Sequence, residues 1–153
     1  MNGKDFSPQS KVWIYQTSRP FTEIEAKEIS GQLNIFTKQW AAHNLQLKAE
    51  GFLFENRVIV LMVDESLTNA SGCSIDKAFG FIQELENKYK VELLNRMIVN
   101  YFNGSEWLTT GLHEINLLDE DTLVIDPLVN NKFDFDSRFV APLKNTWMLH
   151  YAS

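Results

Sequence analysis

Hydrophobic and polar positions follow two different periods along residues 11–102, and the changes of period predict six elements. Short runs of β-branched and aromatic residues are typical of strands, whereas apolar residues three and four positions apart indicate the buried face of a helix. The predicted order is strand, helix, strand, strand, helix, strand. These elements cover residues 12–15, 23–42, 51–54, 57–63, 74–90 and 97–99.

Both predicted helices carry an apolar face, and the first also carries a start signal. Thr22 is followed three residues later by Glu25, which is the spacing of a capping box at a helix N-terminus. The apolar face of the first helix consists of Ile29, Leu33, Phe36 and Trp40. The inner face of the second is predicted at Ile75, Phe79, Ile82 and Tyr89, with Ala78 and Leu85 beside it.

The strand over residues 57–63 does not alternate, and this indicates a central position in the sheet. A strand that is apolar on both faces is usually covered on both sides. The order of the six elements is that of a split βαβ unit, as in ferredoxin-like folds. We therefore predict an α+β protein, a two-layer α/β sandwich with a ferredoxin-like core over residues 11–102. The alternative is another α/β sandwich in which C-terminal strands join the sheet.

The ends of the chain are predicted to behave differently from this core. Residues 1–10 are polar and contain a proline, which favours a flexible N-terminal arm in front of a single domain over residues 11–153. Residues 103–153 are predicted to form an extension of short strands that covers the other sheet face or an edge. Within it we expect a short helix at 112–118, a strand at 123–125 and an irregular surface segment at 132–138.

The distribution of charged residues argues against some classes of binding partner. The 153 residues carry a formal net charge of −6, and the acidic excess lies in the last third of the chain. Because no basic stripe is present, we expect neither nucleic-acid binding nor attraction to an anionic membrane surface. A single cysteine excludes an intramolecular disulfide, and no apolar run is long enough to span a bilayer. We therefore expect a cytoplasmic protein.

The segment between residues 64 and 76 is the strongest candidate for a binding site. A carboxylate ends the predicted central strand, a loop of small polar residues follows, and the second helix begins. Backbone amides and the helix dipole at such a start favour an anion, and they also favour the thiolate form of a cysteine. The candidate residues are Asp64, Ser71, Gly72, Cys73, Ser74 and Asp76.

The same residues also have a purely structural interpretation. Ser74 would cap the helix, Asp76 would complement its dipole, and Cys73 would be a small buried apolar residue. Asp64, Glu65 and Asp76 offer the oxygen ligands that a divalent cation prefers, but acids at strand ends and helix starts have structural uses as well. The histidines have no zinc-binding spacing, so we predict neither a metal nor a cofactor.

Several stretches resemble a family of small uncharacterised bacterial proteins that sometimes carry the label "ABC transporter ATPase". They are residues 12–16, 19–21, 63–65, 71–76 and 142–147, which span nearly the whole chain. The resemblance implies a bacterial, intracellular protein. The ATPase label conflicts with the sequence, because nucleotide hydrolysis of that kind needs a glycine-rich phosphate loop with its lysine, and no such motif is present.

Three functional hypotheses follow. The first, which we favour, is a non-enzymatic binding or interaction module, with a homodimer through a sheet face or edge as one form. It rests on the aromatic content of a small chain without a recognisable catalytic constellation. The second is an enzyme or a binder of small anionic ligands at residues 64–76. The third, suggested only by the family label, is an ATPase component.

Overall fold

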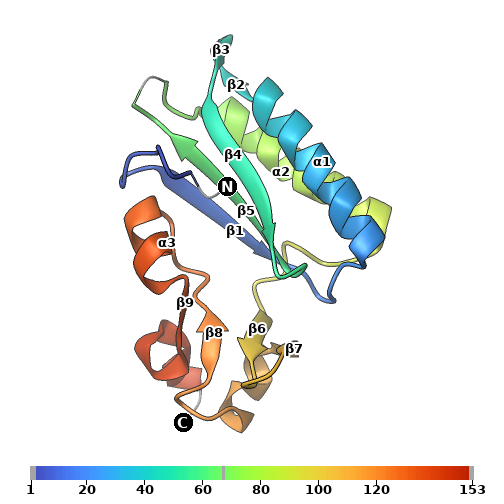
Figure 1. Cartoon of the computed structure of the whole chain (residues 1–153), viewed down its shortest axis with the longest axis vertical. Coiled ribbons are helices and arrows are strands. Elements are labelled where there is room, and N and C mark those ends of the chain that lie inside the picture. Colours follow the sequence, from blue (N-terminus) through green and yellow to red (C-terminus); the bar gives the residue numbers. More distant parts are fainter. Residues whose placement is uncertain (1–2, 67, 152–153) are drawn as a thin grey trace.

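The computed structural model describes residues 3–66 and 68–151, and it combines helices with antiparallel sheets in an α+β architecture (Figure 1). The first sheet has the order β1-β5-β4. It consists of β1 (Lys11–Gln16), β5 (Val58–Asp64) and β4 (Lys48–Phe54). Every residue of β5 is buried, which confirms the central, doubly covered strand that its sequence predicts.

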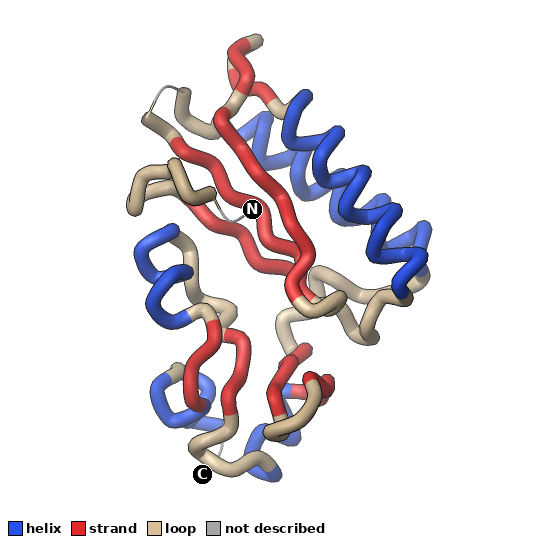
Figure 2. The backbone as a smooth tube through the Cα atoms, viewed as in Figure 1, coloured by secondary structure: helices blue, strands red, loops and turns tan. Residues whose placement is uncertain are grey.

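Helices α1 (Glu23–Gln39) and α2 (Gly72–Tyr89) cover one face of this sheet (Figures 1 and 2). The capping box of α1 is present at Thr22, as predicted. The helix ends three residues before the predicted end because the chain turns back there. Ala41–Ala42 (β2) pairs with Leu45–Gln46 (β3) in a short hairpin.

The buried face of α2 matches the prediction at Ala78, Ile82, Leu85 and Tyr89 and differs from it at Ile75 and Phe79. Ile75 and Phe79 are 38% and 41% exposed, whereas Ser74, one residue before Ile75, is buried. The buried residues of α2 are Ser74, Ala78, Ile82, Leu85 and Tyr89. Trp40 explains the difference, because its fully buried indole lies against this side and donates a hydrogen bond to the Ser74 carbonyl at 2.8 Å.

The strand at 97–99 of the predicted core forms, but it belongs to a second sheet. This sheet has the order β7-β6-β8-β9. Its strands are β6 (Ile98–Phe102), β7 (Trp107–Gly111), β8 (Leu123–Ile125) and β9 (Val140–Pro142). The free side of β1 is instead occupied by residues 130–132, which exchange backbone hydrogen bonds with residues 10–12. The four-stranded ferredoxin-like sheet is therefore not formed in the described residues.

The C-terminal part of the chain packs against part of the second face of the first sheet. One hydrophobic cluster joins the two parts, with Val58, Val60 and Met62 on the sheet side and Ile125 and Phe139 on the other. A separate cluster lies beneath the second sheet, where three short 3-10 helices pack. They are Leu112–Leu117, as expected, Leu143–Asn145 and Trp147–Tyr151.

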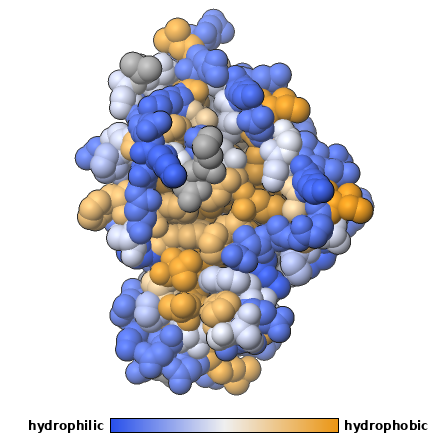
Figure 3. All heavy atoms as spheres, viewed as in Figure 1, coloured by the Kyte–Doolittle hydropathy of each residue, from blue (hydrophilic) through white to orange (hydrophobic). Residues whose placement is uncertain are grey.

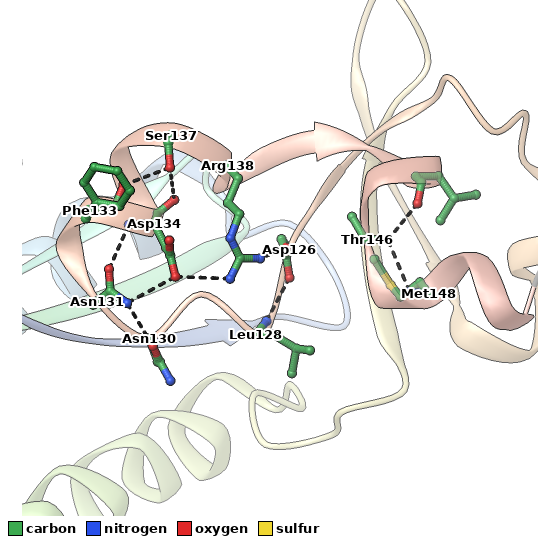
Figure 4. A network of polar contacts seen from close by, with 11 residues as sticks. Asp126, Leu128, Asn130, Asn131, Phe133, Asp134, Ser137, Arg138, Thr146 and Met148 are labelled. Atoms are coloured by element: carbon green, nitrogen blue, oxygen red, sulfur yellow. Dashed lines mark hydrogen bonds and ion pairs between the residues drawn. The ribbon is translucent and has the colours of Figure 1, made fainter.

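Residues 132–138 were expected to be irregular, but Lys132–Arg138 is a helix, α3 (Figure 4). The side chain of Asn131 caps it by accepting a hydrogen bond from the Asp134 amide at 2.8 Å. At its other end Arg138 binds both Asp134 and the buried carboxylate of Asp126. Phenylalanines and acids alternate along this segment with the period of a strand, and this alternation hides the helix.

Residues 3–10, part of the expected arm, lie against the first sheet. Phe6 packs on the cluster around Met62, and the Gly3 amide donates to the carboxylate of Glu50 at 2.6 Å. The Ser7 amide donates to Asp64 at 2.9 Å. Residues 1 and 2 lie outside the described part of the chain.

Candidate functional site

The start of α2 and the β2–β3 hairpin border an open surface cavity of about 540 Å³. The hairpin brings His43 and Asn44 to one wall, and the start of α2 forms the other. Three of the candidate residues, Ser71, Gly72 and Cys73, line the cavity together with Lys77. The structure therefore places part of the predicted segment beside a cavity.

The first turn of α2 leaves two backbone amides directed away from the helix. Ser71 is the N-cap, and its hydroxyl accepts a hydrogen bond from the Ser74 amide at 3.1 Å. The Ser74 hydroxyl in turn accepts from the Ser71 amide at 2.7 Å. Within the described residues, the amides of Gly72 and Cys73 have no protein acceptor. These two amides are the groups through which the helix start can hold an anion.

The expected cap is therefore displaced by three residues. We predicted Ser74 as the capping residue, but Ser71 occupies that position and Ser74 is its buried reciprocal partner. The hydroxyl groups of both serines form hydrogen bonds within the start of the helix. Asp76 is exposed and does not line the cavity.

Asp64 lies apart from the cavity and has a structural role. Asp64 is 3% exposed, and its carboxylate accepts hydrogen bonds from Ser66, through both hydroxyl and amide, and from the Ser7 amide. Lys48 lies 3.5 Å away. The Ser66 hydroxyl contributes most to lowering the pKa of Asp64 from 3.8 to about 2. This carboxylate holds the N-terminal segment and the turn after β5 in place.

Cys73 is exposed, in contrast to the buried position of the structural interpretation. It lines the cavity together with His43, a proximity that the sequence did not predict because 30 residues separate them. No group of three or more histidine, cysteine or acidic side chains that could hold a metal ion occurs in residues 3–66 and 68–151. Asp64, Glu65 and Asp76 thus do not converge there.

A second feature, which the sequence analysis missed, lies on the sheet face opposite α1 and α2. Aromatic rings from β4, β7 and the region around α3 contact one another across the junction of the two sheets. The ring centroids of Phe52 and Phe135 are 5.8 Å apart, and those of Phe54 and Trp107 are 5.6 Å apart. We call this set the aromatic face, and it consists of Phe52, Phe54, Trp107, Phe135 and Phe139.

The aromatic face is only partly covered by the protein. Phe139 is buried, but the other four rings are half-buried, and so is the neighbouring Ile14. Figure 3 shows apolar atoms gathered in the middle of this side of the molecule. The sequence signal was the phenylalanines at positions 52 and 54 on the strand 51–54, but nothing in the pattern indicated that residues 107 and 135 would join them.

Comparisons with models of known protein families, with curated proteins and with solved structures give no match. The family resemblance of residues 71–76 and the other stretches therefore stays a prediction. None of the helices in the described residues combines the length and apolar character needed to cross a membrane.

Proposed function

We propose that the protein is a non-enzymatic binding module that holds an apolar segment of a partner protein against the aromatic face. The observation that carries the proposal is the half-buried state of four aromatic rings supplied by three separate parts of the chain. Large aromatic side chains in well-packed, partly covered positions supply most of the binding energy in protein interfaces.

The packing around α3 supports this use of the face. Arg138 and the Asn131 cap fix the helix that carries Phe135, so this ring is held before any partner arrives. A rigid aromatic side chain loses little conformational freedom on binding, which favours affinity. A second copy of this chain is one such partner. Sedimentation of the free protein at rising concentration would then show a mass that increases to that of a dimer.

The proposal predicts that substitutions in the aromatic face weaken peptide binding. Peptides are selected on the wild-type protein from a displayed library of random short sequences, and their affinities are then measured by calorimetry. We expect Phe52→Ala and Phe135→Ala each to weaken binding by about tenfold or more, because each removes an anchor ring.

Phe133 provides the matched control for this experiment. It lies on the same helix as Phe135 but is 67% exposed and outside the cluster, so Phe133→Ala should bind the selected peptides like wild type. Circular dichroism checks that each variant is folded. Selection that yields no peptide, or peptides that bind Phe52→Ala and Phe135→Ala as tightly as wild type, would rule out the proposed function.

A second candidate function is binding of a small anion or reaction of the thiol at the start of α2. The free amides of Gly72 and Cys73, the exposure of Cys73 and the adjoining cavity favour it. An anion such as inorganic phosphate would accept hydrogen bonds from these amides, with Lys77 on the same cavity wall. Thermal unfolding with and without phosphate measures the resulting stabilisation.

For this second candidate we expect Cys73 to react with a thiol probe in the folded protein. Its exposure gives the probe access to the sulfur. The rate of labelling is measured without denaturant and compared with the rate in the unfolded chain. Cys73 that is labelled only after unfolding would contradict the accessible site.

A further inference from the structure

Arg57 is fixed at the junction of the two sheets. It lies in the turn between β4 and β5, and its guanidinium donates hydrogen bonds to Thr109 on β7 and Asn100 on β6. Asn100 is fully buried, and both its amides, on the backbone and on the side chain, donate to the Gln16 side chain at 3.1 Å. This polar network determines where the guanidinium lies.

The charge of Arg57 has no carboxylate partner among the described residues. Arg19 pairs with Glu25, and Arg138 pairs with Asp126 and Asp134, but Arg57 donates only to neutral oxygens. Its pKa is lowered, chiefly because burial removes water from the guanidinium, while the more distant charge of Glu106 acts in the opposite direction. A partly desolvated cation of this kind gains most from an added carboxylate.

This cation lies at one end of the aromatic face. Thr109 and Trp107 are two residues apart on β7, so their side chains point to the same side of the sheet. The Trp107 ring contacts Phe54, and Phe54 belongs to the strand that leads into the turn holding Arg57. A segment bound along the aromatic rings therefore passes within reach of the guanidinium.

We propose that the partner segment recognised by the aromatic face is apolar and carries one aspartate or glutamate that pairs with Arg57. This inference rests on the proposed function and adds the chemistry of the partner. The acid is a single residue within an apolar stretch, because a protein of net charge −6 repels a strongly acidic partner. A carboxylate also matches the fork of guanidinium donors in geometry.

The test uses the same peptides selected on the wild-type protein. We expect them to share an acidic residue at a fixed distance from their apolar positions. Changing that acid to its amide should weaken binding to wild type by about tenfold, and Arg57→Gln should weaken binding of the parent peptide to a similar extent. The two changes together should weaken binding no more than either alone, as the pair is already broken.

Arg96 serves as the matched control, because it is an exposed arginine outside this network. Arg96→Gln should leave the affinity for each peptide unchanged. The amide substitution in the peptide tests the pair in the unaltered protein, so the result stands even where Arg57→Gln affects folding.

The experiment distinguishes failure of the Arg57 pairing from failure of the proposed function. Peptides that depend on Phe52 but show no acidic position, and whose affinity does not change with an acid-to-amide substitution, would overturn the pairing with Arg57 and leave the proposed function intact. The absence of any peptide that depends on Phe52 and Phe135 would overturn the proposed function, and the pairing with it.

Discussion

Replacing Trp40 with alanine lowers the free energy of unfolding by about 3–5 kcal/mol, the cost of removing a large buried aromatic side chain. Trp40 is 1% exposed, and its ring contacts those of Trp13 and Phe36, with centroids 5.8 Å and 5.1 Å away. The cavity left by the indole would open between α1 and α2. Denaturation in urea, extrapolated linearly to water, measures the loss.

Trp40→Phe separates the two contributions of the indole. Phenylalanine keeps most of the ring packing but cannot donate to the Ser74 carbonyl, so a buried acceptor is left unpaired. We expect this variant to lose about 1–3 kcal/mol, less than the alanine variant. Phe79→Ala, at a half-exposed position of α2, is the control and should lose much less. Wild-type stability of Trp40→Ala would show that the indole does not hold the helices together.

The Trp40 contact also shows why part of the second helix was predicted wrongly. The sequence pattern assigns bulky residues to the core, and so it placed Ile75 and Phe79 inside. The structure places Ser74 inside in place of Ile75, next to the predicted Ala78, because the indole of Trp40 lies against this part of the helix and binds the Ser74 carbonyl. A periodic pattern identifies a helix correctly, but its exact buried face depends on the volume of a residue that is distant in sequence.

The prediction was most successful where a segment carries its own signal. The buried run of β5, the capping box at Thr22 and the short strand β8 all formed where they were expected. The prediction that the strand at 97–99 joins the first sheet was wrong, because the pairing of a strand depends on residues far away in the sequence. Residues 130–132 take the free side of β1, and nothing local in residues 97–102 indicates that competition.

The sequence likewise predicted one part of the candidate site and missed the rest. The helix start at residues 71–74 was found from its composition, although the cap is Ser71 and not Ser74. Asp64 was grouped with it because the two are near in sequence, but the carboxylate turns to Ser66 and Ser7. The aromatic face and Arg57 were not found, since their residues come together only when the two sheets pack.

Asp64 makes the stability of the protein depend on acid pH. Its carboxylate has a pKa of about 2 in the folded chain, against 3.8 for an unperturbed aspartate. A carboxyl group whose pKa is lowered by folding stabilises the folded state at pH values above the unfolded pKa. This stabilisation is lost as the pH falls from 3.8 toward 2, because the unfolded chain then takes up the proton first.

We expect wild type to lose about 2 kcal/mol of stability through Asp64 over this range, and Asp64→Asn to lack this part of the pH dependence. Glu25, whose pKa is also about 2 owing chiefly to its hydrogen bond with Arg19, titrates in the same range. The informative quantity is therefore the difference between wild type and Asp64→Asn, measured by urea unfolding at pH 5 and near pH 2.5. Asp76→Asn, at an exposed position, should keep the wild-type dependence. Parallel pH profiles for wild type and Asp64→Asn would mean that Ser7 and Ser66 do not favour the charged carboxylate.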